Sequence, residues 1–198
     1  FMLFVSGIDK KYILLALLAI VIAAPVVYNN LPPYALKRIE VYLNPGSDPR
    51  DGGYNILQSQ LAIGAGEIFG MGLFKGNQTQ LGFLHPKTTD FIFSVIGEEM
   101  GFVATGSITI LYIVLVTKSI YIAKTAKDNI GSYIAIGIAG IFFFHMAENI
   151  GMTIGLLPIT GVPLPFVSYG GSSLVTNFIS IGLLLNISSR RQKAIFVE

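Results

Sequence analysis

The sequence predicts an all-α protein that crosses a membrane several times. Of its 198 residues, 53% are hydrophobic and only 12% are charged, whereas a soluble domain carries about 25% charged residues. The mean hydropathy is +0.68. Four apolar segments are long enough to cross the hydrocarbon core as helices, which takes about 20 residues at about 1.5 Å per residue. Residues 1–198 are therefore expected to form one polytopic membrane domain.

The composition also excludes several functional classes. The net charge is only +2 and the basic residues are scattered, so we expect no nucleic-acid partner. The absence of cysteine excludes a disulfide scaffold and a thiolate metal site. The chain starts at Phe1 within an apolar phrase and has no small-residue cleavage pattern, so we expect no secretory signal. We expect this sequence to be the C-terminal part of a larger membrane protein.

The apolar segments define the predicted spans, which are residues 12–28, 102–123, 130–157 and 172–188. A shorter apolar piece at 91–97 could extend the second span backward. Basic residues occupy three short connections or flanks: Lys10 and Lys11, Lys124 and Lys127, and Arg190, Arg191 and Lys193. The connection PITGVPLPFVSYGG has no Lys or Arg. Because short basic loops stay in the cytoplasm, both chain ends are predicted to be cytoplasmic and residues 29–90 to form a long external loop.

The external loop is expected to dip into the membrane edge. Residues 29–55 are rich in Pro and Gly turn signals, and residues 56–76 contain a moderately apolar stretch too short to span. We interpret 56–76 as a short interfacial or re-entrant helix, and the polar residues 77–90 as the return to the membrane. Non-helical backbone at this depth must be buried or line a wet cavity, which indicates a cleft at the outer leaflet.

The glycines of GAGEIFGMGLFKG raise the alternative of a phosphate-binding loop. That pattern lacks the GK[ST] ending and a preceding strand, so we favour backbone flexibility or close packing as their role.

Three carboxylates lie at the start of the second span. Asp90 follows two threonines, so it could cap a helix N-terminus, or it could serve as a general base in a membrane cleft. Glu98 and Glu99 lie two turns further on and point about 100° apart on a helix. We expect one of them to line a cavity and the other to pair with a cation or to cap the next helical piece near Met100.

Two further features need an interpretation: a set of polar residues in the third span and a turn before the fourth. His145, Glu148 and Asn149 share one helix face, and a polar seam that bonds to neighbouring helices is favoured over a metal site, since further ligands are missing. The prolines and glycines of residues 161–173 predict a rigid external turn before the fourth span. An anion site at that helix N-terminus is the less favoured alternative.

Four phrases in the chain resemble a known family. They are KRIEVYLNPGSDP, GGYNILQSQLAIGAGEIFGMGLFKGNQTQLGF, TTDFIFSVIGEEMGF and HMAENIGMTIGLLPITGVPLPFVSYGGSS. In content and order they look like the shape, elongation, division and sporulation (SEDS) family, typified by RodA and FtsW. The phrase GLFKGNQTQLGF resembles the rod-shape type more than the division type. The family has about ten spanning helices, so the resemblance is to its C-terminal part.

The resemblance implies a peptidoglycan glycosyltransferase. Such an enzyme polymerises lipid II into glycan strands at the outer face of the bacterial cytoplasmic membrane, for cell elongation and shape, together with a class B penicillin-binding protein. The family's essential acidic residue, in its TDF motif, falls on Asp90. One departure is visible, because His85-Pro86-Lys87 stands where the family commonly has Leu-Pro-Glu.

In that mechanism Asp90 is expected to be the catalytic base. Cations must stabilise the pyrophosphate leaving group, with Arg38, Arg50 and Lys75 as candidates, and a divalent cation could assist although no protein metal-ligand set is visible. Further candidates for substrate contact are Gln80, Glu98, Glu99, Ser168 and Tyr169. The rival hypothesis is a lipid II flippase, which would need a polar path to the inner leaflet. The second span is apolar from Val103 to Val116 apart from Thr and Ser, which favours the enzyme.

Overall fold

The computed structural model describes residues 2, 9–44, 46, 48, 52–85 and 88–191, and this part of the chain contains helices and no strands. Four of its helices are long and apolar enough to span a membrane: α2 (Lys10–Asn29), α6 (Ile92–Lys124), α7 (Asn129–Thr153) and α8 (Gly171–Arg191). The predicted all-α class and the four apolar helices are confirmed.

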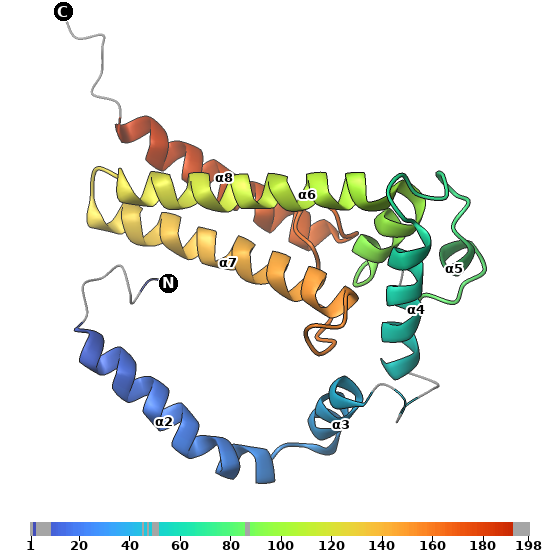
Figure 1. Cartoon of the computed structure of the whole chain (residues 1–198). Coiled ribbons are helices and arrows are strands. Elements are labelled where there is room, and N and C mark those ends of the chain that lie inside the picture. The colour runs from blue at the N-terminus through green and yellow to red at the C-terminus, as the bar shows by residue number, and fades with distance from the viewer. Residues whose placement is uncertain are drawn as a thin grey trace, which may run out of the picture.

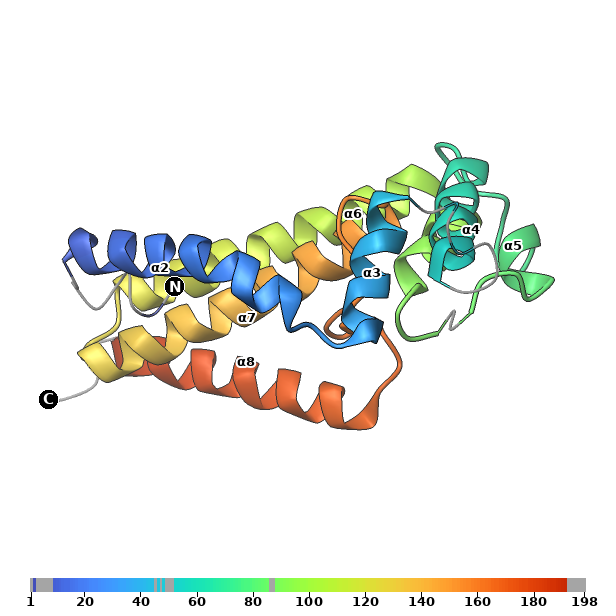
Figure 2. The same ribbon diagram turned by 90° about the horizontal axis from the view of Figure 1, so that it is seen from below.

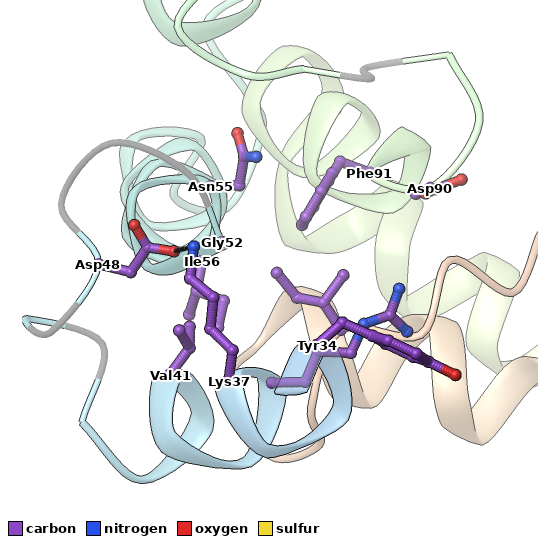
Figure 3. A pocket seen from close by; sticks show the side chains of 11 residues that line it. Tyr34, Lys37, Val41, Asp48, Gly52, Asn55, Ile56, Asp90 and Phe91 are labelled. Carbon is purple, nitrogen blue, oxygen red and sulfur yellow. Dashed lines mark ion pairs between the residues drawn. The ribbon is translucent and has the colours of Figure 1, made fainter. Parts of the chain in front are cut away.

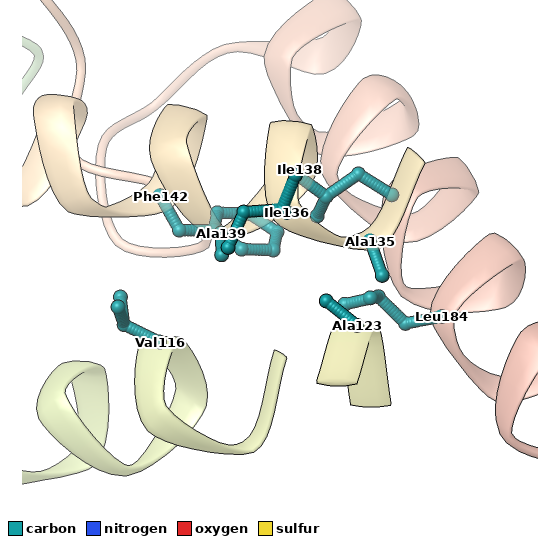
Figure 4. Close-up of a cluster of buried hydrophobic side chains, with 8 residues drawn as sticks. All are labelled: Val116, Ala123, Ala135, Ile136, Ile138, Ala139, Phe142 and Leu184. Carbon is teal, nitrogen blue, oxygen red and sulfur yellow. The ribbon is translucent and has the colours of Figure 1, made fainter. Parts of the chain in front are cut away.

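Helices α6, α7 and α8 form a bundle, with α6 and α7 side by side in opposite directions (Figures 1 and 2). Between apolar helices in lipid, close packing replaces the hydrophobic driving force. Small side chains allow this approach, since Ala135 and Ala139 are fully buried. Figure 4 shows them among the buried cluster of Val116, Ala123, Ala135, Ile136, Ile138, Ala139, Phe142 and Leu184.

Helix α2 stands apart from this bundle (Figure 1). None of its most apolar stretch is buried within the described chain, and Leu14, Leu18 and Val21 are all exposed. A helix that is apolar on all sides is stable only in surroundings that are apolar too, such as lipid or further helices. The exposure of α2 therefore suits a membrane span.

Helix α7 ends at Thr153, four residues before the predicted end of the third span. Gly155 has φ +79°, which only glycine adopts without strain. The Leu156 amide donates to the Gly151 carbonyl at 2.8 Å, and the Gly155 amide donates to Met152 at 3.2 Å. This pair of bonds is a Schellman motif, which satisfies the last carbonyls and stops the helix.

The segment between α2 and α6, which we call the connecting segment (residues 30–91), forms three short helices in its described residues. They are α3 (Pro33–Leu43), α4 (Gly52–Ala65) and α5 (Asn77–Gln80). They gather at the end of the bundle where α6 begins and α7 ends (Figures 1 and 2). The turn signals of residues 29–55 did not predict α3. Pro33 at the start of α3 is compatible with a first helical turn, and no Gly or Pro follows until residue 45.

Helix α6 is broken at Gly101, which has φ 71° and ψ −168°. A break leaves carbonyls and amides without helical partners, and such groups are costly in a membrane. Four backbone bonds to residues 67–72 satisfy them: Met71 N to Glu98 O (2.9 Å), Gly72 N to Glu99 O (3.0 Å), Phe102 N to Glu67 O (2.9 Å) and Val103 N to Ile68 O (3.1 Å). We call this set the backbone stitch. It attaches the connecting segment to the first third of α6.

The glycines beside the stitch allow two backbones to touch. A Cβ atom at Gly66 would overlap the Gly97 carbonyl oxygen, and one at Gly70 would overlap the Glu99 carbonyl. A Cβ at Gly101 would overlap the backbone of Ile68 and Gly70. The glycine-rich stretch is thus explained by close packing, the role favoured over a phosphate loop.

We predict that Gly70→Ala destabilises the protein, whereas Gly64→Ala does not. Gly70 has φ +82° and no room for a Cβ, so alanine there should lower the free energy of unfolding by at least about 1–2 kcal/mol. Gly64 lies in α4 with nothing within 4 Å of a new Cβ. Thermal unfolding of the purified proteins in detergent measures the difference. Equal transition temperatures for the two variants would contradict the stitch as a stabilising contact.

Candidate active site

A cavity of about 280 Å³ lies between α3, the start of α4 and the residues just before α6 (Figure 3). Its lining residues are Tyr34, Lys37, Arg38, Val41, Asp48, Gly52, Asn55, Ile56, Asp90, Phe91 and Ile159. Helix α3 places Tyr34, Lys37 and Arg38 on one face, since they are separated by three and four residues. The cavity therefore joins a cationic helix face to an aspartate.

Asp90 is half-buried at the cavity wall. It does not cap α6, because the N-cap residue is Phe91 and no side chain makes a capping bond there. The capping interpretation of Asp90 was wrong. Among the described residues, its carboxylate has no hydrogen-bond or ion-pair partner. Its Oδ2 atom lies opposite Gly161, where an added Cβ would be 3.1 Å away. The carboxylate is thus available for a ligand in the cavity.

The cations of the cavity differ in their pairing. Lys37 forms an ion pair of 2.9 Å with Asp48. Arg38 is exposed and has no ion pair within the described part of the chain. Arg50 lies outside the described residues. Sequence reasoning missed Lys37 because α3 was not recognised; with α3 in place, the spacing from Tyr34 would have put Lys37 on the cavity face.

Glu98 and Glu99 do not line this cavity. The fully buried Glu98 accepts hydrogen bonds from the amides of Gln78 at 2.7 Å and Thr79 at 3.0 Å, and from the Thr79 hydroxyl. These are the free amides at the start of α5, so Glu98 caps that helix across space. Glu99 accepts from the Gln80 side chain at 3.2 Å. Both glutamates bond to α5 instead, and substrate contact by either of them stays a prediction.

The remaining predicted contacts also lie outside this cavity. Lys75 is exposed in the turn before α5, and Gln80 is exposed and bonded to Glu99. Tyr169 is 81% exposed. The Ser168 hydroxyl donates to the Thr89 carbonyl at 2.6 Å and accepts from the Leu164 amide at 2.8 Å. Ser168 thus anchors the residues before Asp90, and substrate contact by these four side chains stays a prediction.

The polar side chains of α7 form the expected seam, but with a different partner. Glu148 accepts from the Thr160 hydroxyl at 2.8 Å, and a ring nitrogen of His145 lies 3.3 Å from the Pro163 carbonyl oxygen. Asn149 donates to the carbonyls of Asp90 and Val162, both at 2.9 Å. The seam therefore binds Asp90 and residues 160–163 rather than neighbouring helices.

The described residues contain no group of three His, Asp or Glu side chains placed to hold a metal ion. Asp48 and Asp90 are the carboxylates of the cavity lining, and Asp48 is paired with Lys37. A divalent cation here would need water molecules and the oxygens of a bound phosphate group as further ligands, as is common for Mg²⁺.

A family model described as "Cell cycle protein", named for FtsW, RodA and SpoVE, matches residues 1–193. The chain belongs to this family. It is a multi-pass membrane protein, and the family resemblance drawn from its motifs is confirmed.

Relatives of both the rod-shape and the division type match the chain. "Peptidoglycan glycosyltransferase RodA" of Treponema pallidum (strain Nichols) is 45% identical over 161 residues, which cover 81% of this chain and 37% of that protein. "Probable peptidoglycan glycosyltransferase FtsW" of Geobacter sp. (strain M18) is 43% identical over 194 residues, which cover 98% of this chain and 52% of that protein.

The fold is also similar to a solved structure, titled "Structural coordination of polymerization and crosslinking by a peptidoglycan synthase complex". The similarity has a TM-score of 0.79 at 30% identity and covers 97% of this chain and 53% of that chain. This chain thus spans about half the length of such proteins, or less.

We predict that Glu98→Gln loosens α5 from α6. The neutral amide cannot accept all of the hydrogen bonds that the carboxylate accepts, and bonds to a charged group contribute about 1.5–3 kcal/mol. Hydrogen exchange at the amides of Gln78 and Thr79 should therefore be at least about tenfold faster. The matched control is Glu40→Gln, because Glu40 is exposed on α3. Unchanged exchange in Glu98→Gln would show that the carboxylate does not hold α5.

Proposed function

We propose that this protein is a peptidoglycan glycosyltransferase that polymerises lipid II into glycan strands. The observation that carries the proposal is the unpaired Asp90 carboxylate, which shares a cavity with Arg38. An enzyme that transfers a glycosyl group from a pyrophosphate needs a base for the attacking hydroxyl and positive charge for the leaving group. The names of the relatives support the same reaction.

The proposed step begins with proton transfer to Asp90 from a sugar hydroxyl of the acceptor lipid II. The hydroxyl oxygen then forms a bond to the anomeric carbon of the growing glycan chain. The bond from that carbon to the pyrophosphate oxygen breaks, and polyprenyl pyrophosphate leaves with the bonding electrons. Because attack comes from the face opposite the leaving group, the anomeric configuration inverts.

Arg38 is the residue proposed to stabilise the departing pyrophosphate. Its guanidinium is always charged and can form two parallel bonds to a phosphate group. It has no competing carboxylate among the described residues. Lys37 adds positive charge on the same face of α3, although Asp48 offsets part of it.

The cavity is proposed to face the outside of the cytoplasmic membrane. The end of α6, the connection from α6 to α7 and the end of α8 lie at the bundle end opposite the connecting segment (Figure 1). These parts of the chain carry the basic residues Lys124, Lys127 and Arg190. Under the positive-inside rule that end is cytoplasmic, together with both chain ends. The lipid II head group would then meet Asp90 from outside.

A class B penicillin-binding protein is the proposed partner, which would crosslink the new strands. The similarity to a chain of a synthase complex that couples polymerisation and crosslinking supports this partner. The rod-shape role in cell elongation rests on the phrase GLFKGNQTQLGF.

We predict that Asp90→Asn lowers the rate of lipid II polymerisation by at least about 100-fold, as expected when a general base is removed. The asparagine is close in size and cannot take a proton from the acceptor hydroxyl. The measurement uses the full-length protein with its penicillin-binding partner, purified lipid II and separation of the glycan products by length.

Two outcomes would contradict the proposal. Equal polymer yield from wild type and Asp90→Asn would remove Asp90 from the reaction. Movement of lipid II between leaflets of a vesicle, without any polymer, would instead support the flippase hypothesis.

We predict that Arg38→Gln lowers polymerisation by about tenfold or more, because the developing pyrophosphate charge loses a bidentate partner worth about 1.5–3 kcal/mol. The matched control is Arg190→Gln, an exposed arginine at the far end of α8. The same polymerisation assay compares the two variants. Similar rates for both would exclude Arg38 as the pyrophosphate contact.

A further inference from the structure

Three consecutive backbone carbonyls lead into the proposed catalytic base, and each one accepts a hydrogen bond from a residue between 149 and 169. Thr88 O accepts from the Tyr169 amide at 3.0 Å, Thr89 O from the Ser168 hydroxyl at 2.6 Å, and Asp90 O from the Asn149 side chain at 2.9 Å. Residues 88–90 precede α6, so no helical bond fixes their conformation. These three bonds hold them instead.

Asn149 makes the bond closest to the reacting carboxylate. The side chain is fully buried near the end of α7, and its amide nitrogen donates to both Asp90 O and Val162 O at 2.9 Å. Both partners are carbonyl acceptors, so the atom that faces them must be the NH₂ group. A single amide therefore uses both of its hydrogens to join two chain segments.

The second segment also touches Asp90. Val162 follows Gly161, whose position lies opposite Asp90 Oδ2 at 3.1 Å from where a Cβ would stand. Asn149 thus holds the backbone of Asp90 and, through Val162, the loop that faces its carboxylate. Loss of either bond would change where the carboxylate lies in the cavity.

We infer that Asn149 is a positioning residue for the Asp90 carboxylate, an inference that rests on the proposed function. Asn149 does not line the cavity, so it acts through Asp90 and not on the substrate. A displacement of about 1 Å in a reacting group can lower a rate by about 100-fold. Holding the main chain of the base is therefore enough to give Asn149 a large effect on the rate.

A double-mutant cycle separates positioning from a general structural role. The four forms of the full-length protein are wild type, Asn149→Leu, Asp90→Asn and the double variant, each with its penicillin-binding partner and lipid II. Asn149→Leu keeps the branching and the number of side-chain heavy atoms and removes both donors. It is expected to lower the polymerisation rate about 10- to 100-fold in the wild-type background and less than about twofold when Asp90 is already Asn.

The matched control is Asn177→Leu, which removes a buried amide from α8 whose bond to the Ser173 hydroxyl, at 3.4 Å, stays within that helix. It is expected to keep the wild-type rate within about twofold. Asn149→Ser retains one donor and is expected to lie between Asn149→Leu and wild type. Thermal unfolding of each variant accompanies the rates, and Asn149→Ser replaces Asn149→Leu in the cycle if the latter does not fold.

The outcomes are distinguishable. If Asn149→Leu lowers the polymerisation rate by the same factor with Asp90 and with Asn at position 90, the positioning role is overturned while Asp90 remains the base. A wild-type polymerisation rate in Asn149→Leu would have the same meaning. A wild-type rate in Asp90→Asn would overturn the proposed function itself. A loss confined to the background that contains Asp90 supports the inference.

Discussion

Backbone hydrogen bonding at the break in α6 is the constraint on which the rest of the structure depends. A helix at membrane depth cannot leave carbonyls or amides unpaired, since water is not there to replace the lost bonds. Gly101 breaks α6, and the four bonds of the backbone stitch repair the loss with residues 67–72. The connecting segment must therefore lie against α6. Its attachment there brings α3 and α4 to the end of the bundle where Asp90 lies.

The buried glutamates follow from the same constraint. A carboxylate inside a membrane domain is costly unless several donors surround it. Glu98 gains three donors from the first turn of α5, and that turn in turn has its free amides satisfied. The charge of Glu98 thus fastens the connecting segment to α6. Of the two carboxylates that line the cavity, Asp48 is paired with Lys37 and Asp90 has no partner among the described residues. This contrast separates the structural glutamates from the proposed catalytic aspartate better than their spacing does.

Rigidity around Asp90 comes from a second set of bonds, made by α7 and the turn that follows it. Asn149 of α7 and Ser168 of the turn bond to backbone carbonyls of Asp90 and Thr89, so the Asp90 carboxylate stays free while its main chain is fixed. If Asp90 is the base, as proposed, a main chain held in this way needs no reorganisation when a substrate arrives, which is the advantage of a preorganised site. The cationic face of α3 completes the cavity from the opposite side.

The sequence by itself predicted the four spans, and its motifs singled out Asp90 through the family resemblance, because apolar length and local motifs are properties of the chain alone. It did not predict α3, since turn signals in the neighbouring residues outweighed an ordinary helical stretch, and Lys37 was missed with it. Only the tertiary structure decided that Glu98 caps α5 and that Asn149 holds Asp90. Their partners lie 19 and 59 residues away in the chain, and no local pattern specifies which distant backbone group a buried side chain will meet.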